Sequence, residues 1–316
     1  MTKSEAMKLA LKIGISLIIM VALITQIRPD RLSATLKAMG FLPLAMAVVF
    51  YLFAQLISAY RWRGLANAMA IGGGLGEYYR YYLKGMFLNL FLPTAIGGDV
   101  GRVVMLSRSQ GCTWLQAFLS ILCERTCGLV GLMLYAVVGI FIMVPSQWPL
   151  YGSIALGMLL LASGFTMGFR RLDHTLWGQT LINRFVLKQQ NLHDEPAEIW
   201  PKTRPVLTGF AISLVFHLMV ITVQMYLLHR LGGSTPFLIL ASIYGLAGVA
   251  SMIPLSFNGI GLREGAMTLL LILWSHVTRE VATAYSLVWL SVLVLAAIPG
   301  GILFLVDQFR PVRQET

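Results

Sequence analysis

The run of residues 92–102, Leu-Pro-Thr-Ala-Ile-Gly-Gly-Asp-Val-Gly-Arg, contains the residue types of an anion site. Pro93 interrupts a helix, and three glycines let backbone N–H groups approach a ligand closely. If a helix begins at or just after Asp99, its positive dipole end lies beside Arg102, which suits an anion. The alternative is a structural helix break, with Asp99 as the N-cap and Arg102 paired with a carboxylate. The glycines are Gly97, Gly98 and Gly101.

A second run, residues 254–265, repeats this chemistry as Pro-Leu-Ser-Phe-Asn-Gly-Ile-Gly-Leu-Arg-Glu-Gly. It begins with Pro254 and reaches Arg263 and Glu264 where a new helix is expected. The alternative is an ion pair between these two neighbours at the outer interface. Two breaks with matched arginine and acid favour a binding site more than either break alone. The residues expected to approach a ligand between them are Asn258, Gly259 and Gly261.

Glu124 and Arg125 stand in an otherwise apolar helical stretch. A charge at the centre of a membrane helix costs about 2.5–3.5 kcal/mol on insertion scales, so such residues normally face a partner or a wet cavity. Glu124 paired with Arg102 or Arg263 would hold a cationic site open. The alternative places both residues in the interface. His217, in another apolar stretch, is predicted to be a packed, hydrogen-bonded histidine rather than a proton carrier.

Neither a metal nor another cofactor is expected. Cys123 and Cys127 are four residues apart in an apolar helix, and further ligands are not nearby, which favours buried free thiols. A phosphate-binding loop of the G-x-x-x-x-G-K-[ST] type is also missing from the sequence. Any energy source would therefore be an ion gradient or none. Trp62, Tyr78 and Tyr82 are predicted to be interfacial aromatics.

The elements that must position these residues are membrane helices. Hydrophobic residues make up 57% of the 316 and charged residues only 12%, against roughly a quarter in a soluble domain. Crossing the hydrocarbon takes about 20 apolar residues. The sequence therefore predicts an all-α, polytopic transmembrane helix bundle with about six full spans, forming a single integral membrane domain over residues 1–316. The predicted spans are 8–27, 41–60, a helix ending near Val144, 150–169, 206–228 and 281–306.

Two apolar regions do not fit as simple spans, because the runs described above interrupt them. Each of the two, around residues 77–110 and 232–280, should enter and leave the membrane on its own side. The first is predicted to be a re-entrant hairpin, and the second either a re-entrant hairpin or a pair of crossings broken at depth. Interrupted segments of opposite orientation indicate an inverted repeat with a central substrate site.

The formal charge of +11 is explained by membrane topology rather than by nucleic-acid binding. Most Lys and Arg residues gather in five segments that the positive-inside rule places in the cytoplasm, together with both termini. Residues 170–204 are expected to form a cytoplasmic, amphipathic loop on the inner surface. The first span should be a retained anchor, since no small-x-small cleavage site follows it. The basic segments are the N-terminal tail, 61–84, 102–108, 170–204 and the C-terminal tail.

Taken together, these motifs resemble the membrane domain of the lysylphosphatidylglycerol synthase family, a flippase-like group that includes stand-alone inner-membrane proteins. The resemblance covers essentially the whole chain and implies handling of phospholipid or another anionic polar lipid. The aminoacyl transfer for which the family is named is not implied, because it uses a separate soluble domain. The matching residues are Leu92-Pro93-Thr94, Gly97, Gly98, Asp99, Arg102, Glu124, Arg125, Pro254, Gly259, Gly261, Arg263, Glu264 and Gly265.

The expected function is therefore lipid translocation in an inner membrane, with an anionic head group bound in a central cationic cavity. A membrane-embedded transferase acting on a polyprenyl or phospholipid donor ranks lower, because the sequence has no Asp-x-Asp pair. A solute carrier and an accessory subunit are further alternatives. The expected partners are membrane lipids, in particular anionic phospholipid, and a nucleic-acid partner is not expected. The sequence leaves open a homo-oligomer.

Overall fold

The computed structural model describes residues 3–25, 29–91, 97–143, 203–253 and 255–308, with a few isolated positions between 149 and 160 and residue 201. These residues form helices and no strand, which confirms the predicted all-α class. The elements are α1 (Lys3–Thr25), α2 (Pro29–Met39), α3 (Phe41–Asn67), α4 (Leu75–Phe91), α5 (Gly97–Gln110), α6 (Trp114–Met143), α9 (Thr203–Arg230), α10 (Phe237–Met252), η3 (Phe257–Gly259), α11 (Leu262–Ser275) and α12 (Arg279–Gln308).

In the described part of the chain, four helices are long and apolar enough to cross a membrane. They are Phe41–Asn67, Trp114–Phe141, Thr203–Arg230 and Arg279–Asp307, and they coincide with four of the predicted spans. Helix α1 coincides with a fifth, although its apolar part, Ile13–Leu23, is shorter. The predicted span 150–169 and the loop 170–204 lie almost wholly outside the described residues.

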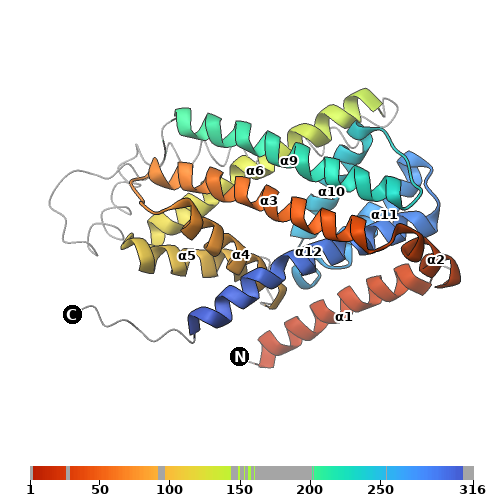
Figure 1. Ribbon diagram of the computed structural model, residues 1–316, viewed down its shortest axis with the longest axis horizontal. Helices are drawn as coiled ribbons and strands as arrows, with labels where there is room; N and C mark the ends of the chain where they lie inside the picture. The colour runs from red at the N-terminus through yellow and green to blue at the C-terminus, as the bar shows by residue number, and fades with distance from the viewer. Residues whose placement is uncertain are drawn as a thin grey trace.

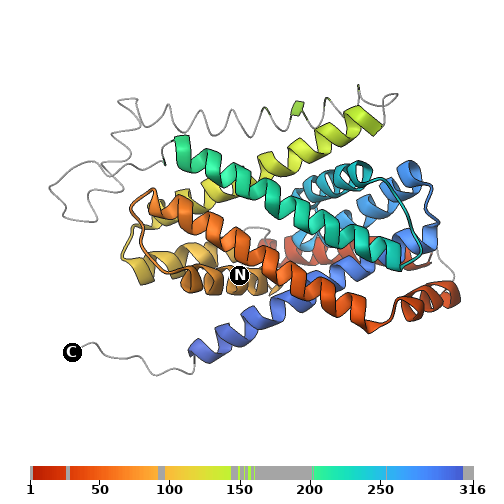
Figure 2. The same cartoon turned by 45° about the horizontal axis from the view of Figure 1, so that its top comes forward.

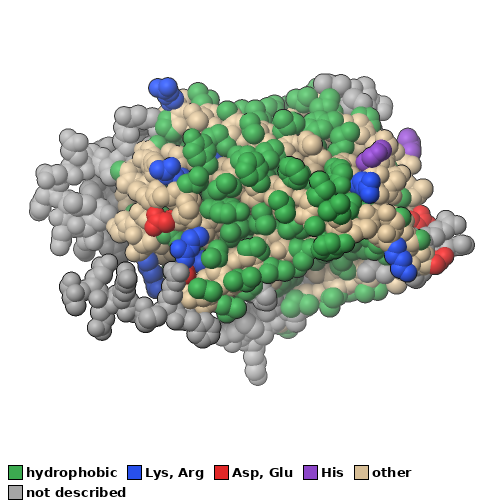
Figure 3. Space-filling model, viewed as in Figure 1, with side chains coloured by type: hydrophobic (Ala, Val, Ile, Leu, Met, Phe, Trp, Pro, Cys, Tyr) green, Lys and Arg blue, Asp and Glu red, His purple; other side chains and the backbone are tan. Residues whose placement is uncertain are grey.

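The long helices run along the long axis of the molecule (Figure 1). A band of hydrophobic side chains covers the middle of the visible face, and charged side chains gather towards its two ends (Figure 3). This distribution suits a bilayer, in which a hydrocarbon slab separates two polar interfaces. Between the helices, two buried clusters form the core. One is built on α9, α10, α11 and α12, and the other surrounds Trp62 where α3, α4, α5 and α6 meet.

Both interrupted regions have the predicted form of helix, break and helix. Helix α4 packs against α5, and α10 packs against α11. The two hairpins lie at opposite ends of the molecule and turn near its middle (Figures 1 and 2). With 17, 14, 16 and 14 residues, these helices are roughly 21–26 Å long at 1.5 Å per residue. Each is shorter than the roughly 30 Å of hydrocarbon, as re-entrant hairpins require.

Close backbone contact explains the glycines at the first break. A Cβ atom at Gly98 would collide with the carbonyl oxygen of Gly85 on the opposite helix. The N–H of Gly98 donates to Asn89 Oδ1 at 2.7 Å, so the new helix begins with its backbone already bonded. That helix starts at Gly97, which places Asp99 inside its first turn rather than at the N-cap.

Left-handed backbone geometry shapes the second break. Asn258, Gly259 and Gly261 have φ angles of +51°, +74° and +91°. Glycine adopts such angles without the steric penalty that a Cβ atom brings. Helix α1 supports the break, because Ser16 Oγ accepts a 2.8 Å hydrogen bond from the N–H of Phe257. A helix outside the hairpin therefore stabilises the backbone of the break.

Candidate functional site

Five charged side chains from three helices form one connected cluster near the first break. Asp99 accepts two hydrogen bonds from Arg125, from Nε at 2.9 Å and from Nη2 at 2.7 Å, and a third from Arg102 Nη1 at 3.1 Å. Glu124 accepts from Arg61 and, at 3.5 Å, from Arg102 Nη2. Arginines and carboxylates therefore alternate along the cluster. Its members are Arg61 on α3, Asp99 and Arg102 on α5, and Glu124 and Arg125 on α6.

Glu124 is the centre of this cluster and has no exposed surface. Besides the two arginines, it accepts a 3.1 Å hydrogen bond from the hydroxyl of Tyr82 on α4. Arg61 in turn donates to Ser213 Oγ on α9 at 2.7 Å. A buried carboxylate is tolerated only when it is paired and hydrogen-bonded, and this one ties together five helices. Of the two partners predicted for Glu124, the structure shows Arg102.

Arg102 lies between two aromatic rings. Its Cζ atom is 4.0 Å from the ring centre of Trp62 and 4.2 Å from that of Tyr82. Only 1% of the side chain is exposed, and Arg102 is not among the residues that line a cavity nearby. We therefore assign it a positioning role, in which its ion pairs hold Asp99 and Glu124 in place. Of the two interpretations made from the sequence, this arrangement matches the pairing of Arg102 with carboxylates, at the position of the break.

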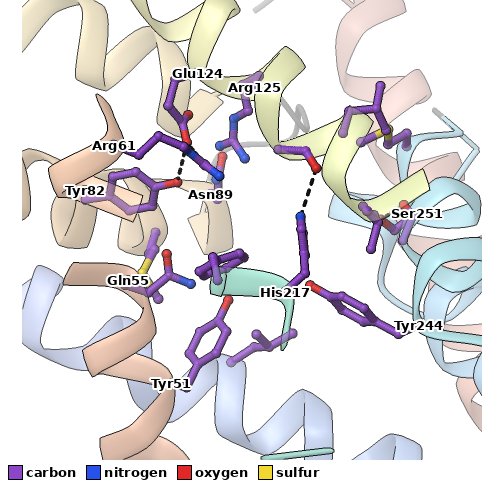
Figure 4. A pocket seen from close by; sticks show the side chains of 18 of the residues that line it. Tyr51, Gln55, Arg61, Tyr82, Asn89, Glu124, Arg125, His217, Tyr244 and Ser251 are labelled. Carbon is purple, nitrogen blue, oxygen red and sulfur yellow. Dashed lines mark hydrogen bonds and ion pairs between the residues drawn. The ribbon is translucent and has the colours of Figure 1, made fainter. Parts of the chain in front are cut away.

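A cavity of about 710 Å³ opens in front of the cluster, in the middle of the molecule. We call it the central cavity. Arg125 lies on one side of it, and His217 and Tyr244 lie across from Arg125 (Figure 4). The side chain of Arg125 is 48% exposed although it is ion-paired, and that of Arg263 is 18% exposed. The polar and aromatic residues of the lining are Tyr51, Gln55, Arg61, Tyr82, Asn89, Glu124, Arg125, Thr126, Phe216, His217, Tyr244, Ser251, Arg263 and Trp289.

The second break contributes Arg263 to this cavity. Its Nε and Nη2 donate to one oxygen of Glu264 at 2.9 and 2.6 Å. The other oxygen of Glu264 accepts from the N–H of Gly261 at 2.7 Å. The neighbour ion pair that the sequence suggested therefore exists, and its arginine lines the central cavity. Asn258 is not part of the lining, and Pro93 and Pro254 lie outside the described residues.

The charges around the central cavity do not cancel. Four arginines face three carboxylates, which are Asp99, Glu124 and Glu264. One net positive charge is thus left in a region where low dielectric strengthens electrostatic interactions. Arg125 and Arg263 each use Nε and Nη2 on their carboxylates, and Nη1 of each has no acceptor among the described residues. These nitrogens can donate to an anionic ligand.

His217 also lines this cavity. Its Nε2 lies 2.8 Å from the carbonyl oxygen of Gly128, which can only accept, so Nε2 carries the proton. Nδ1 is therefore an acceptor, and it is buried without a partner in the described part of the chain. The predicted packed, hydrogen-bonded histidine agrees with this geometry. The structure adds a buried ring nitrogen, Nδ1, with no partner among the described residues.

Sequence reasoning missed Arg61 and Tyr82, which it placed at the cytoplasmic interface. Helix α3 continues to Asn67 and carries Arg61 into the core, where its side chain is 4% exposed. Trp62 and Tyr78 are also predicted to be interfacial aromatics. Both are fully buried, with their ring centres 4.8 Å apart, so neither ring faces lipid head groups. The available signal was the polar row of Gln55, Ser58 and Arg61, three residues apart on an apolar helix.

The cysteines agree with the sequence interpretation. Cys123 and Cys127 are buried free thiols, and Cys112 is a partly buried one. Within the described residues, no three His, Cys, Asp or Glu side chains are grouped in a way that would hold a metal ion.

Comparison with known proteins places the chain among membrane proteins. The family described as the lysylphosphatidylglycerol synthase TM region matches residues 9–300. A UPF0104 membrane protein from Methanothermobacter thermautotrophicus is 25% identical over 321 residues, which cover 92% of this chain and 94% of that protein.

Proposed function

Because this chain belongs to the lysylphosphatidylglycerol synthase TM region family, we propose that it moves an anionic phospholipid between membrane leaflets. The single observation that supports this most is the accessible Arg125 in a central cavity with a net positive charge. The family makes a lipid-related membrane role the natural setting. On this proposal the protein acts as a transporter without catalysing a reaction.

The geometry suggests how such a protein lowers the barrier. A lipid phosphate loses its hydration when it leaves the interface, and a buried charge must be paired to be tolerated. The free Nη1 donors of Arg125 and Arg263 would pair with the phosphate from two sides of the cavity. The acyl chains would stay in the hydrocarbon, outside the cavity.

The meeting of two opposed hairpins gives the cavity its central position. The first tip brings Asp99, which holds Arg125 of α6, and the second brings Arg263 with Glu264, from different ends of the molecule (Figure 2). Such inverted, interrupted helices surround midplane substrate sites in transporters. We further propose that the protein lies in the inner membrane with both termini in the cytoplasm, because that orientation satisfies the positive-inside rule.

The test is head-group translocation in proteoliposomes that contain labelled anionic or zwitterionic phospholipid. Wild type is expected to accelerate the anionic lipid over empty liposomes. Arg125→Gln removes one charge-assisted contact, which is worth about 1.5–3 kcal/mol, so the rate should fall by roughly 10- to 100-fold. Arg108→Gln removes an exposed charge from α5 and should leave the rate unchanged. A folded wild type that moves no lipid faster than empty liposomes would overturn the proposal.

A further inference from the structure

Two further cavities lie between α3 and α9, apart from the central one. The first, the basic cavity of about 340 Å³, lies where α3 ends and α9 begins. The second, the apolar cavity of about 370 Å³, lies further along the same two helices. The basic cavity is lined by Arg61, Arg63, Gly64, Arg204 and Thr208, among others. The apolar cavity is lined by residues such as Met46, Phe50, Leu218, Thr222 and Tyr226.

Helical spacing puts both cavities on one face of the helix pair. On α9, Thr208 and Thr222 are fourteen positions apart, close to four turns, so they point the same way. Between them at the same spacing stands Val215, which is 50% exposed. On α3, Phe53 is 55% exposed between Phe50 and Gly64. An exposed apolar strip therefore connects the basic cavity to the apolar cavity, along helices that lie side by side (Figures 1 and 2).

The basic cavity has the electrostatics of an anion site. Three arginines line it, and none of its described lining residues is Asp or Glu. Arg204 is exposed, and its side chain has no partner among the described residues. Arg63 donates Nε to the carbonyl of Gly73 at 3.0 Å, and its other nitrogens have no acceptor among the described residues. Helix α9 begins at Thr203, so its positive dipole end adds to the same field.

The strip is long enough for one acyl chain, because it exceeds the depth of one leaflet. From Thr208 to Thr222 the helix rises about 21 Å, at 1.5 Å per residue. One leaflet is about 15 Å deep, half of the roughly 30 Å of hydrocarbon. A chain that hangs from a head group in the basic cavity would run along the strip towards the apolar cavity. A soluble anion would use the basic cavity alone, so the strip favours a lipid.

Arg61 connects this face to the interior, because it lines both the basic cavity and the central cavity. Its side chain is 4% exposed and is held by Glu124 and Ser213. It therefore stands as a partition between the two spaces. A phosphate arriving from the basic cavity would meet Arg61 before it reached the central cavity.

We infer that the α3/α9 face, from the basic cavity to the apolar cavity, is a lateral docking site for an anionic phospholipid from the bilayer. The phosphate binds at Arg204 and Arg63, one acyl chain lies along the strip, and Arg61 is the partition that the head group passes. This inference rests on the proposed function, for which it supplies the loading site.

The first test is native mass spectrometry of the full chain with phosphatidylglycerol or phosphatidylcholine. Arg204→Ala is expected to weaken phosphatidylglycerol binding about fivefold, the effect of one basic residue near an anionic head group. Arg230→Ala removes the exposed arginine at the other end of the same helix and should change nothing. Equal binding by wild type and Arg204→Ala would overturn the docking site. So would full displacement of the lipid by inorganic phosphate at an equal concentration.

The second test examines the acyl chain. Thr222→Trp fills the apolar cavity and should weaken both lipids, whereas Val294→Trp, at an exposed apolar position of α12, should weaken neither. Unchanged lipid binding in a folded Thr222→Trp variant would overturn the assignment of the strip to an acyl chain.

The two proposals fail in different ways. If Arg125→Gln stops translocation while Arg204→Ala alters neither binding nor translocation, the docking site is wrong and the central cavity stands. If wild type translocates nothing while Arg204→Ala still weakens phosphatidylglycerol binding, the docking site stands and the translocation proposal is wrong.

Discussion

Replacing Glu124 by glutamine is the sharpest perturbation of this structure. Glu124, Arg61 and Arg102 are 0%, 4% and 1% exposed, so the substitution leaves two buried guanidinium groups without their shared counter-charge. Removing one partner of a buried ion pair typically destabilises a protein by 3–5 kcal/mol. Glutamine keeps the shape and one oxygen acceptor, so we expect a loss near the lower end, about 3 kcal/mol. Asp99 remains to pair with Arg102, whereas Arg61 contacts no other carboxylate among the described residues.

The assay is the free energy of unfolding in mixed micelles, followed by tryptophan fluorescence, because Trp62 stacks on Arg102 in the same cluster. Asp30→Asn is the matched control, since Asp30 is exposed in the first turn of α2. Its loss should stay within about 1 kcal/mol. The double variant Arg61→Gln with Glu124→Gln should lose less than the sum of the two single variants, because the buried charges disappear together.

A loss below about 1 kcal/mol for Glu124→Gln would refute the reasoning. It would mean that the charge of Glu124 does not hold Arg61 and Arg102 in place. A fully additive double variant would lead to the same conclusion.

Three other predictions concern the break, the cavity and the aromatic stack. Gly98→Ala should lower the free energy of unfolding by about 1–3 kcal/mol because its methyl group meets the Gly85 carbonyl, whereas Gly14→Ala, in open space, should not lower it. His217→Phe should lower the free energy of unfolding by about 1–3 kcal/mol, because the Gly128 carbonyl loses the donor Nε2; an unchanged free energy of unfolding would count against this. Arg102→Lys should reduce thermal stability although charge is conserved, because lysine cannot stack between two rings; an unchanged melting temperature would contradict that role.

The membrane class, four of the long spans and the existence of both breaks can be predicted from the sequence. These features are local: apolar length decides whether a helix can cross, and proline and glycine decide where it ends. The pairing of Glu124 with Arg102 was one of two pairings predicted from the sequence, since a charged side chain in an apolar helix requires a partner of opposite charge. The ion pair between Arg263 and Glu264 can likewise be predicted, because the two residues are adjacent in the sequence.

Which arginine lines the cavity and which one supports it depends on packing between helices that are distant in the sequence. Arg102 and Arg125 look alike in sequence, but Arg102 lies between two aromatic rings and Arg125 is 48% exposed. The sequence also placed Arg61 at an interface, where basic residues usually lie, whereas packing of α3 against α6 and α9 buries it beside Glu124. Exposure of a charged side chain depends on neighbours far away in the chain, and hydrophobic length and spacing contain no information about them.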